Sequence, residues 1–196
     1  MGSADLRVPF ESMDEVRRRV LDATVRCAME YSLQRTTVEE ISIESGVSRA
    51  TIYRHFPAGR EAIVGATVAD QVDAFLIALA EDVSEATSTQ ELLVTGLMAA
   101  HRRLKSHQLF ARVMAVEPEL VLPSLTTESN RVVGVIGRFM APFVSADEPE
   151  TPEVQILAQC DHLARLFLSH VESPGSWDLT SPDDVRELVE TQFLIR

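Results

Sequence analysis

The sequence predicts an all-α protein with a small N-terminal head and a larger helical body. Apolar side chains recur at helical spacing through almost the whole chain, and no segment shows the strict alternation of a half-buried strand. Helix start and stop signals interrupt this pattern at regular places. With 196 residues, 45% of them hydrophobic and 24% charged, the chain has a globular composition. We expect a head over residues 1–58 and a body over 59–196.

Three helices are expected in the head, each with its own start signal. The pattern Ser/Thr-x-x-Glu forms a capping box at Ser12 and again at Thr37. Gly46 ends the second helix, and Ser48 caps the third. The expected helices cover about 13–31, 37–45 and 48–55.

The body continues the helical pattern, and prolines interrupt it. We expect Pro118 to stop one helix, Pro123 to interrupt the chain again and Pro142 to end the next helix. Thr151 and Pro152 have the residue types of an N-cap followed by a first helical position. The expected helices cover about 60–83, 90–106, 107–116, 125–141, 152–172 and 182–194.

Charge divides the chain in the same way. Residues 1–60 contain nine Arg and nine Asp or Glu, so the net charge of −12 belongs entirely to residues 61–196. An acidic body does not attract nucleic acid or an anionic membrane, and any such activity is expected in the head. No uninterrupted apolar run approaches bilayer length and no secretory signal is evident, so we expect a cytoplasmic protein without membrane contact. Cys27 and Cys160 form no CxxC pair and are expected to be buried thiols.

The second and third helices of the head meet at Gly46-Val47-Ser48, which is the arrangement of a helix-turn-helix. Val47, Ile52 and Phe56 are expected to point inward against Ile41. The outward side chains of the third helix are then suited to DNA, because Arg donates two hydrogen bonds to guanine and Thr, Tyr and His donate to phosphates. These outward residues are Arg49, Thr51, Tyr53, Arg54 and His55.

The head resembles the tetracycline-repressor-type (TetR) family of transcriptional regulators. The resemblance covers about residues 13–65, and it lies in three segments: Thr37-Val38-Glu39-Glu40-Ile41, Ser45-Gly46-Val47-Ser48, and Thr51-Ile52-Tyr53-Arg54-His55-Phe56-Pro57 followed by Arg60-Glu61-Ala62-Ile63. The rest of the chain matches the family only in length and helical character. Two departures are Ser32, where a glycine is common, and Arg60, near the usual position of a lysine.

The resemblance implies roles for individual residues of the head. Arg49, Ala50, Tyr53 and Arg54 occupy positions that face bases, and Thr37, Thr51 and His55 occupy positions that hold phosphates. The whole expected DNA-binding set is Thr37, Ser48, Arg49, Ala50, Thr51, Tyr53, Arg54, His55 and Arg60. The run Arg17-Arg18-Arg19 fits a solvated helix face better than a row of phosphate contacts.

For the body we expect dimerisation and ligand binding. The helices at 152–172 and 182–194 carry apolar stripes wider than one neighbour covers, and they are the expected homodimer interface. The resemblance also implies a pocket for a small-molecule effector of unknown identity. Its candidate lining residues are Phe75, Leu79, Met98, His101, Phe110, Arg112, Met114 and Phe139, although such residues at helical spacing are more often plain core.

These expectations describe a repressor that binds a palindromic operator as a dimer and is released by a small hydrophobic ligand. An enzyme is disfavoured, because GxSxG, GxGxxG, GxxxxGK[ST] and HExxH are all absent. His162 and His170 lack a third close ligand, so neither a metal nor a cofactor is expected. The alternative is a helical protein-interaction module, or a small-molecule sensor, without direct DNA binding.

Overall fold

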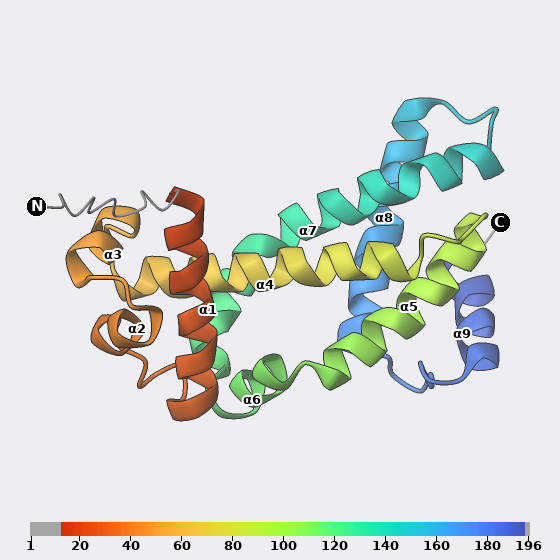
Figure 1. Cartoon of the computed structure of the whole chain (residues 1–196). Coiled ribbons are helices and arrows are strands. Elements are labelled where there is room, and N and C mark those ends of the chain that lie inside the picture. Colours follow the sequence, from red (N-terminus) through yellow and green to blue (C-terminus); the bar gives the residue numbers. More distant parts are fainter. Residues whose placement is uncertain (1–12, 195–196) are drawn as a thin grey trace, which may run out of the picture. The chain divides into compact units, whose positions relative to one another are not determined.

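The structure, a computed structural model, describes residues 13–194, except for the side chains of Met13, Val113, Met114, Val116, Pro118 and residues 120–127. The described residues form helices joined by turns and contain no strand, which confirms the all-α fold class (Figure 1). The helices are α1 (Met13–Tyr31), α2 (Val38–Ser45), α3 (Arg49–His55), α4 (Arg60–Asp82), α5 (Thr89–Ser106), α6 (Gln108–Val116), α7 (Pro118–Asp147), α8 (Glu153–Glu172), α9 (Pro182–Leu188) and the π-helical segment Val189–Phe193.

The chain divides into two compact units between Asp70 and Gln71, inside α4. The sequence suggests a boundary at 58/59, before this helix begins. The difference has a packing cause, since Ile63 of α4 is fully buried in the core of the first unit and Ala66 packs against that core. The first turns of α4 therefore complete the head. The division of labour between a DNA-binding part and a ligand-binding part stays a prediction.

The head is held together by one apolar core and by its helix caps. Val20, Ile41, Ile52 and Ile63 are completely buried. At the start of α2, the Thr37 hydroxyl accepts a hydrogen bond from the Glu40 amide at 3.2 Å, and the Glu40 carboxylate accepts one from the Thr37 amide at 2.7 Å. This reciprocal pair is the predicted capping box. The other predicted box begins at Ser12, which lies outside the described residues.

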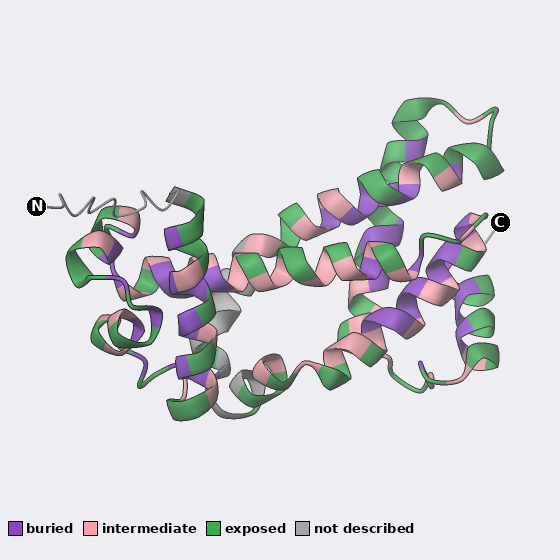
Figure 2. Cartoon of the chain, in the orientation of Figure 1, coloured by how far each residue is buried: buried purple, intermediate pink, exposed green. Residues whose placement is uncertain are grey.

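The body has a separate core to which α5, α7, α8 and α9 contribute (Figure 2). Leu97, Ala164 and Leu188 are completely buried in it. The predicted burial of both thiols is confirmed, with Cys160 in this core and Cys27 in the head. Burial raises the pKa of each thiol above its ordinary value, which keeps the thiols protonated and unreactive.

Two expectations about proline are wrong, because α7 runs unbroken from Pro118 to Asp147 through both Pro123 and Pro142. A proline inside a helix loses one backbone hydrogen bond. Around Pro142 the packing of α7 offsets this loss, since Met140 and Val144 on either side are both buried in the body core. A smaller difference concerns α8, whose N-cap is Pro152 rather than Thr151.

By length and composition alone, α4 is long and apolar enough to cross a membrane. Core helices of globular proteins pass the same test. Within α4, Ile63 and Val64 are buried near one end, and Leu79 is buried near the other.

Candidate functional site

The turn between α2 and α3 fixes the direction of α3. Gly46 has a φ of +66°, a left-handed conformation that glycine adopts without a steric penalty. Val47 is buried next to it, and its carbonyl accepts a hydrogen bond from the Ser42 hydroxyl at 2.7 Å. Ser48 is the N-cap of α3, where its hydroxyl accepts from the Thr51 amide at 3.2 Å. The predicted helix-turn-helix is therefore present in full.

Helix α3 has one buried and one exposed side. Ile52 and Phe56 are buried in the head core, while Arg49, Tyr53 and Arg54 are exposed on the other side (Figure 2). The ring of Tyr53 lies against Gly59, where an added Cβ would come within 3.1 Å of the Tyr53 Cε1 atom. Because a short, firmly packed helix presents two arginines and a tyrosine to solvent, its outer side has the donors that a major groove accepts.

The remaining predicted contact residues lie around this exposed side. Thr37, Ser48 and Ala50 are exposed, whereas Thr51 and His55 are half-buried. Arg60 has a structural role, since its Nε donates to the Thr36 carbonyl at 2.9 Å and its Nη2 to the Leu33 carbonyl at 2.7 Å. These bonds fix the loop before α2 to the start of α4, and the phosphate contact of Arg60 stays a prediction.

Sequence reasoning missed the roles of two arginines in the run Arg17-Arg18-Arg19. The guanidinium of Arg17 lies over the ring of Phe56, 4.9 Å from its centroid. Arg19 donates to the Ser45 carbonyl from Nη2 at 2.6 Å and from Nε at 3.2 Å, which satisfies the C-terminal end of α2. Only the tertiary structure brings these partners together. Arg18 is exposed.

The exposed side of α3 also has one acidic neighbour. Arg49 Nη1 lies 3.9 Å from a carboxylate oxygen of Glu39, which is on α2. Both side chains are largely exposed, so the pair contributes little to folding. A phosphate or a base can therefore displace Glu39 from Arg49 at small cost.

The body contains an apolar pocket among α4, α5, α7 and α8, with a volume of about 390 Å³. Leu79, Ile136 and Phe167 form part of its wall, and Ile77 and Phe139 are exposed lining residues. Asp73 is the one charged side chain among the described lining residues, and its carboxylate accepts from Arg131 Nη1 at 2.6 Å. A pocket with this lining suits a small apolar ligand.

The predicted ligand-binding residues are distributed over several places. Leu79 and Phe139 line the apolar pocket, and Phe75 packs against the body core. Met98 and His101 line a different cavity, at the C-terminal end of α5. Phe110 and Arg112 lie on α6 and line neither of these two cavities. Met114 lies outside the residues whose side chains are described.

Gly96 lines the apolar pocket and was not among the predicted residues. A Cβ at this position would come within 3.2 Å of Phe167 Cε2, so the missing side chain lets Phe167 approach α5 closely. A signal for this was present in the sequence, because a glycine in the interior of a helix costs about 1 kcal/mol and usually has a packing reason.

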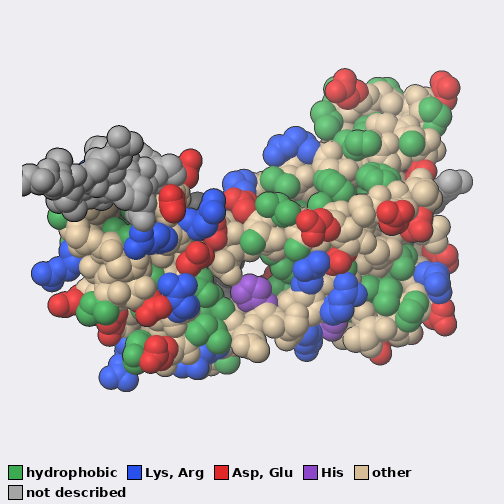
Figure 3. Space-filling view, viewed as in Figure 1, with side chains coloured by type: hydrophobic (Ala, Val, Ile, Leu, Met, Phe, Trp, Pro, Cys, Tyr) green, Lys and Arg blue, Asp and Glu red, His purple; other side chains and the backbone are tan. Residues whose placement is uncertain are grey.

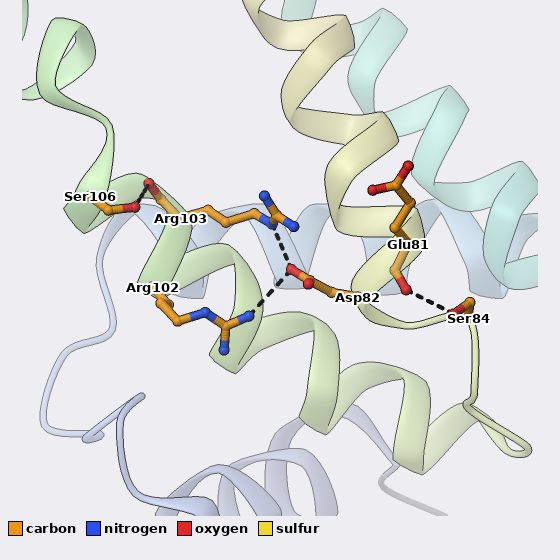
Figure 4. Close-up of polar contacts among 6 residues, drawn as sticks. All are labelled: Glu81, Asp82, Ser84, Arg102, Arg103 and Ser106. Carbon is orange, nitrogen blue, oxygen red and sulfur yellow. Dashed lines mark hydrogen bonds and ion pairs between the residues drawn. The ribbon is translucent and has the colours of Figure 1, made fainter.

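The end of α4 is attached to α5 by a carboxylate next to the pocket wall (Figure 4). Asp82 accepts from Arg103 Nε at 2.5 Å, and Arg102 Nη2 lies 3.4 Å away. The hydrogen bond from Arg103 is the largest of the effects that lower the pKa of Asp82 below its ordinary value of 3.8. The turn that follows is closed by the Ser84 hydroxyl, which donates to the Glu81 carbonyl at 2.8 Å.

Among the described residues, no three His, Cys, Asp or Glu side chains are grouped so that they hold a metal ion. His162 and His170, the pair noted in the sequence, lie on α8, and His170 Nδ1 is 2.9 Å from the Leu166 carbonyl.

The geometry of the head is that of a helix-turn-helix protein, and comparisons with known proteins indicate which helix-turn-helix proteins it resembles. Residues 20–67 match the family model described as bacterial regulatory proteins of the tetR family. An uncharacterized HTH-type transcriptional regulator of Mycobacterium bovis is 31% identical over 99 residues, which are 50% of each chain. The head therefore resembles the DNA-binding part of tetR-family regulators. It spans about half the length of the curated relatives it matches.

Solved structures show the same fold beyond the head. The TetR family repressor AlkX from a Dietzia strain, implicated in biodegradation of n-alkanes, is 19% identical with a TM-score of 0.62, over 88% of this chain and 92% of that one. The regulator FadR from Bacillus subtilis, solved with stearoyl-CoA, is 18% identical with a TM-score of 0.50, over 89% and 97%. At these identities the likeness concerns the fold alone.

Proposed function

We propose that the chain is a transcription regulator that binds an operator in duplex DNA through α3. The proposal rests on one observation. Ile52 and Phe56 bury one side of α3 in the head core, so that Arg49, Tyr53 and Arg54 are exposed to solvent together. The family of the head supports it. By the chemistry of their donors, we assign base contacts to Arg49, Tyr53 and Arg54 and phosphate contacts to the neighbouring hydroxyls, His55 and Arg60. The resemblance to the tetR family adds Ala50, an exposed residue of the same helix, to the residues that face bases.

Selection of bound duplexes from a random pool tests this function. We expect a palindromic sequence, because two copies of the head related by a two-fold axis bind two half-sites of opposite orientation. Arg49→Ala and Arg54→Ala are each expected to weaken binding of the selected duplex by about 1–3 kcal/mol and to relax its base preference. The matched control is Arg138→Ala, which removes an exposed arginine from α7. Equal losses in all three variants would contradict the assignment.

We further propose that a neutral apolar molecule fills the pocket and releases the DNA. The lining supports this ligand class, because the described residues supply apolar side chains and no cation. The implication of AlkX in the biodegradation of n-alkanes is consistent with this ligand class. Release follows if the ligand binds more tightly to a conformation that does not fit the operator. In a DNA-release assay we expect n-decanol to act at lower concentration than decanoate. The opposite order would contradict the ligand class.

For the homodimer we propose an interface on α8 and α9. On α8, Val154 is 79% exposed and Leu157 is 49% exposed, and these two apolar side chains are three residues apart on one helix face. On α9, Val185 and Leu188 are buried within the chain, so this helix contributes its polar outer side. Leu157→Glu is expected to shift the sedimentation of the protein towards monomer, whereas Leu157→Met leaves it unchanged. A Leu157→Glu protein that stays dimeric would exclude this part of α8.

The alternative function is a helical interaction module or sensor that does not bind DNA. The salt dependence of the binding affinity distinguishes this alternative from the proposed function. Binding that neutralises several phosphates weakens steeply with salt, whereas docking of a net-neutral head to a protein does not. We also propose that the chain acts in the cytoplasm, without a cofactor and without catalytic activity.

A further inference from the structure

We infer that the body has a second ligand site, a cationic groove at the C-terminal end of α5 that binds a small organic phosphate with an apolar part. The groove is a separate cavity from the apolar pocket, with different lining residues and a volume of about 670 Å³. This size accommodates a drug-sized molecule. The site goes beyond the proposed function, since neither DNA nor the apolar pocket takes part in it.

One side of α5 forms the first wall of the groove. Met98, His101, Arg102 and Lys105 all line the cavity, and their spacing places them on a single helix face. The opposite wall comes from the segment between α8 and α9, where Leu179 and Thr180 line the same cavity. All of these residues belong to the body unit, so the groove is formed within one compact part of the chain.

The charge of the groove is opposite to that of the body around it. Residues 61–196 have a net charge of −12, yet the groove lining contains Arg102, Lys105 and His101 and no carboxylate among its described residues. Lys and Arg side chains gather on the surface over α5 in Figure 3. In an acidic body, a cavity lined in this way selects for an anion.

The two fixed charges of the groove are available to a ligand. Lys105 is exposed, and it forms no ion pair with any residue that the structure describes in full. Arg102 is 66% exposed and lies 3.4 Å from Asp82, whereas Arg103 contacts the same carboxylate oxygen at 2.5 Å. Because Arg103 keeps Asp82 paired, Arg102 can turn to an incoming anion without leaving that carboxylate alone. A guanidinium beside an ammonium suits the several oxygens of a phosphate ester.

An apolar part of the ligand is expected because the groove is not lined by charges alone. Met98 and Leu179 both contribute apolar surface to it. Asp178, next to this wall in sequence, accepts from the Thr180 hydroxyl at 2.7 Å and from the Thr180 amide at 2.9 Å, and its carboxylate also interacts electrostatically with His101. The positive charge of the groove therefore comes from Arg102 and Lys105. The apolar pocket, in contrast, has Asp73 as its charged lining residue. Because Arg131 already pairs with Asp73, the apolar pocket favours a neutral ligand, whereas the groove favours an anion.

A natural reporter is placed beside the groove. Trp177 is the one tryptophan in the sequence and is partly buried against the body core, two residues before Leu179. Titration with n-hexyl phosphate, followed by Trp177 fluorescence and by calorimetry, is expected to show saturable binding that weakens with salt. Inorganic phosphate is expected to bind more weakly than hexyl phosphate, and n-hexanol more weakly still. Equal binding of hexyl phosphate and hexanol would overturn the inference.

Matched variants then place the binding in the groove. The double variant Arg102→Gln and Lys105→Gln is expected to raise the Kd for hexyl phosphate at least about tenfold. A control with the same change in charge is Arg138→Gln combined with Arg165→Gln, two exposed residues of α7 and α8 that do not line the groove. This control is expected to keep the Kd within about twofold of the native value. Circular dichroism verifies that both proteins are folded. Unchanged binding in the groove variant, or an equal loss in the control, would overturn the inference, and neither result depends on whether the protein binds DNA.

Discussion

The head and the body acquire their candidate binding surfaces in different ways. In the head, a single short helix, α3, presents all the side chains proposed to contact bases, and two neighbouring caps and one turn glycine fix its direction. In the body, the apolar pocket is formed by residues of four helices, spread in sequence from Asp73 to Phe167. A contiguous site leaves a motif in the sequence, whereas a cavity depends on packing that a single sequence does not show.

Substitutions in the two apolar cores are expected to destabilise the protein most, and they test whether the head and the body unfold separately. Ile52 is completely buried in the head, so Ile52→Ala is expected to destabilise the head by about 2–5 kcal/mol. Far-UV circular dichroism should then show an early partial transition together with loss of operator binding, while the Trp177 fluorescence transition of the body stays in place. Leu97→Ala, at a completely buried position in the body, is the reciprocal change and is expected to move the Trp177 transition. If Ile52→Ala shifts the Trp177 transition as far as Leu97→Ala does, the two units unfold as one.

This contrast also explains how much could be predicted from the sequence. The caps at Thr37 and Ser48 and the buried side of α3 follow local rules that involve neighbouring residues, and the structure has them as predicted. The roles of Arg17 and Arg19 were not predictable, because their partners Phe56 and Ser45 lie on other helices. The continuity of α7 through Pro142 was not predictable either, since it depends on burial in the body core.

A smaller effect is expected at a strained residue of the head. Ser32 follows α1 with a φ of 93°, a left-handed conformation that is costly for any residue with a Cβ. Ser32→Gly is therefore expected to stabilise the head by about 1 kcal/mol, measured by denaturant unfolding. Ser176→Gly makes the same change in the body at a residue without positive φ, and it should be neutral or slightly destabilising. A Ser32→Gly protein less stable than the native one would show that the conformation carries no strain.

In the body, the hydrogen bond between Arg103 and Asp82 is expected to make the stability depend on pH. The hydrogen bond from Arg103 lowers the pKa of Asp82 in the folded protein, so the unfolded chain binds this proton more readily. The resulting stability is fully present above pH 3.8, the ordinary pKa, and is lost as the pH falls below that value through the folded pKa. Asp82→Asn is expected to cost about 0.5–1 kcal/mol at neutral pH, and the difference from the native protein should shrink below pH 3.8.

The control for Asp82 is Asp183→Asn. Asp183 pairs with Arg186 within α9 and its side chain is 92% exposed, so little stability is expected from this pair. A pH-independent difference between Asp82→Asn and the native protein would exclude the proposed linkage.

Removal of the acidic neighbour of α3 is expected to change operator affinity only a little. Glu39→Gln removes the carboxylate that lies 3.9 Å from Arg49, so operator affinity is expected to rise by about twofold to fivefold at low salt. Glu187→Gln makes the same charge change on α9 of the body and is expected to leave operator affinity unchanged. Weaker DNA binding by Glu39→Gln would mean that the carboxylate orients Arg49 for its contact.

Binding of duplex DNA by the exposed side of α3 is the proposal on which the others depend, and the salt dependence of operator binding is its sharpest test. The affinity of the native protein for its selected duplex should fall with a slope of log K against log salt of about −5, as expected for about six neutralised phosphates. The double variant Arg49→Ala and Arg54→Ala should bind more weakly and with a shallower slope. A slope near zero for the native protein, or a double variant with native affinity and native slope, would show that α3 does not bind DNA in the proposed way.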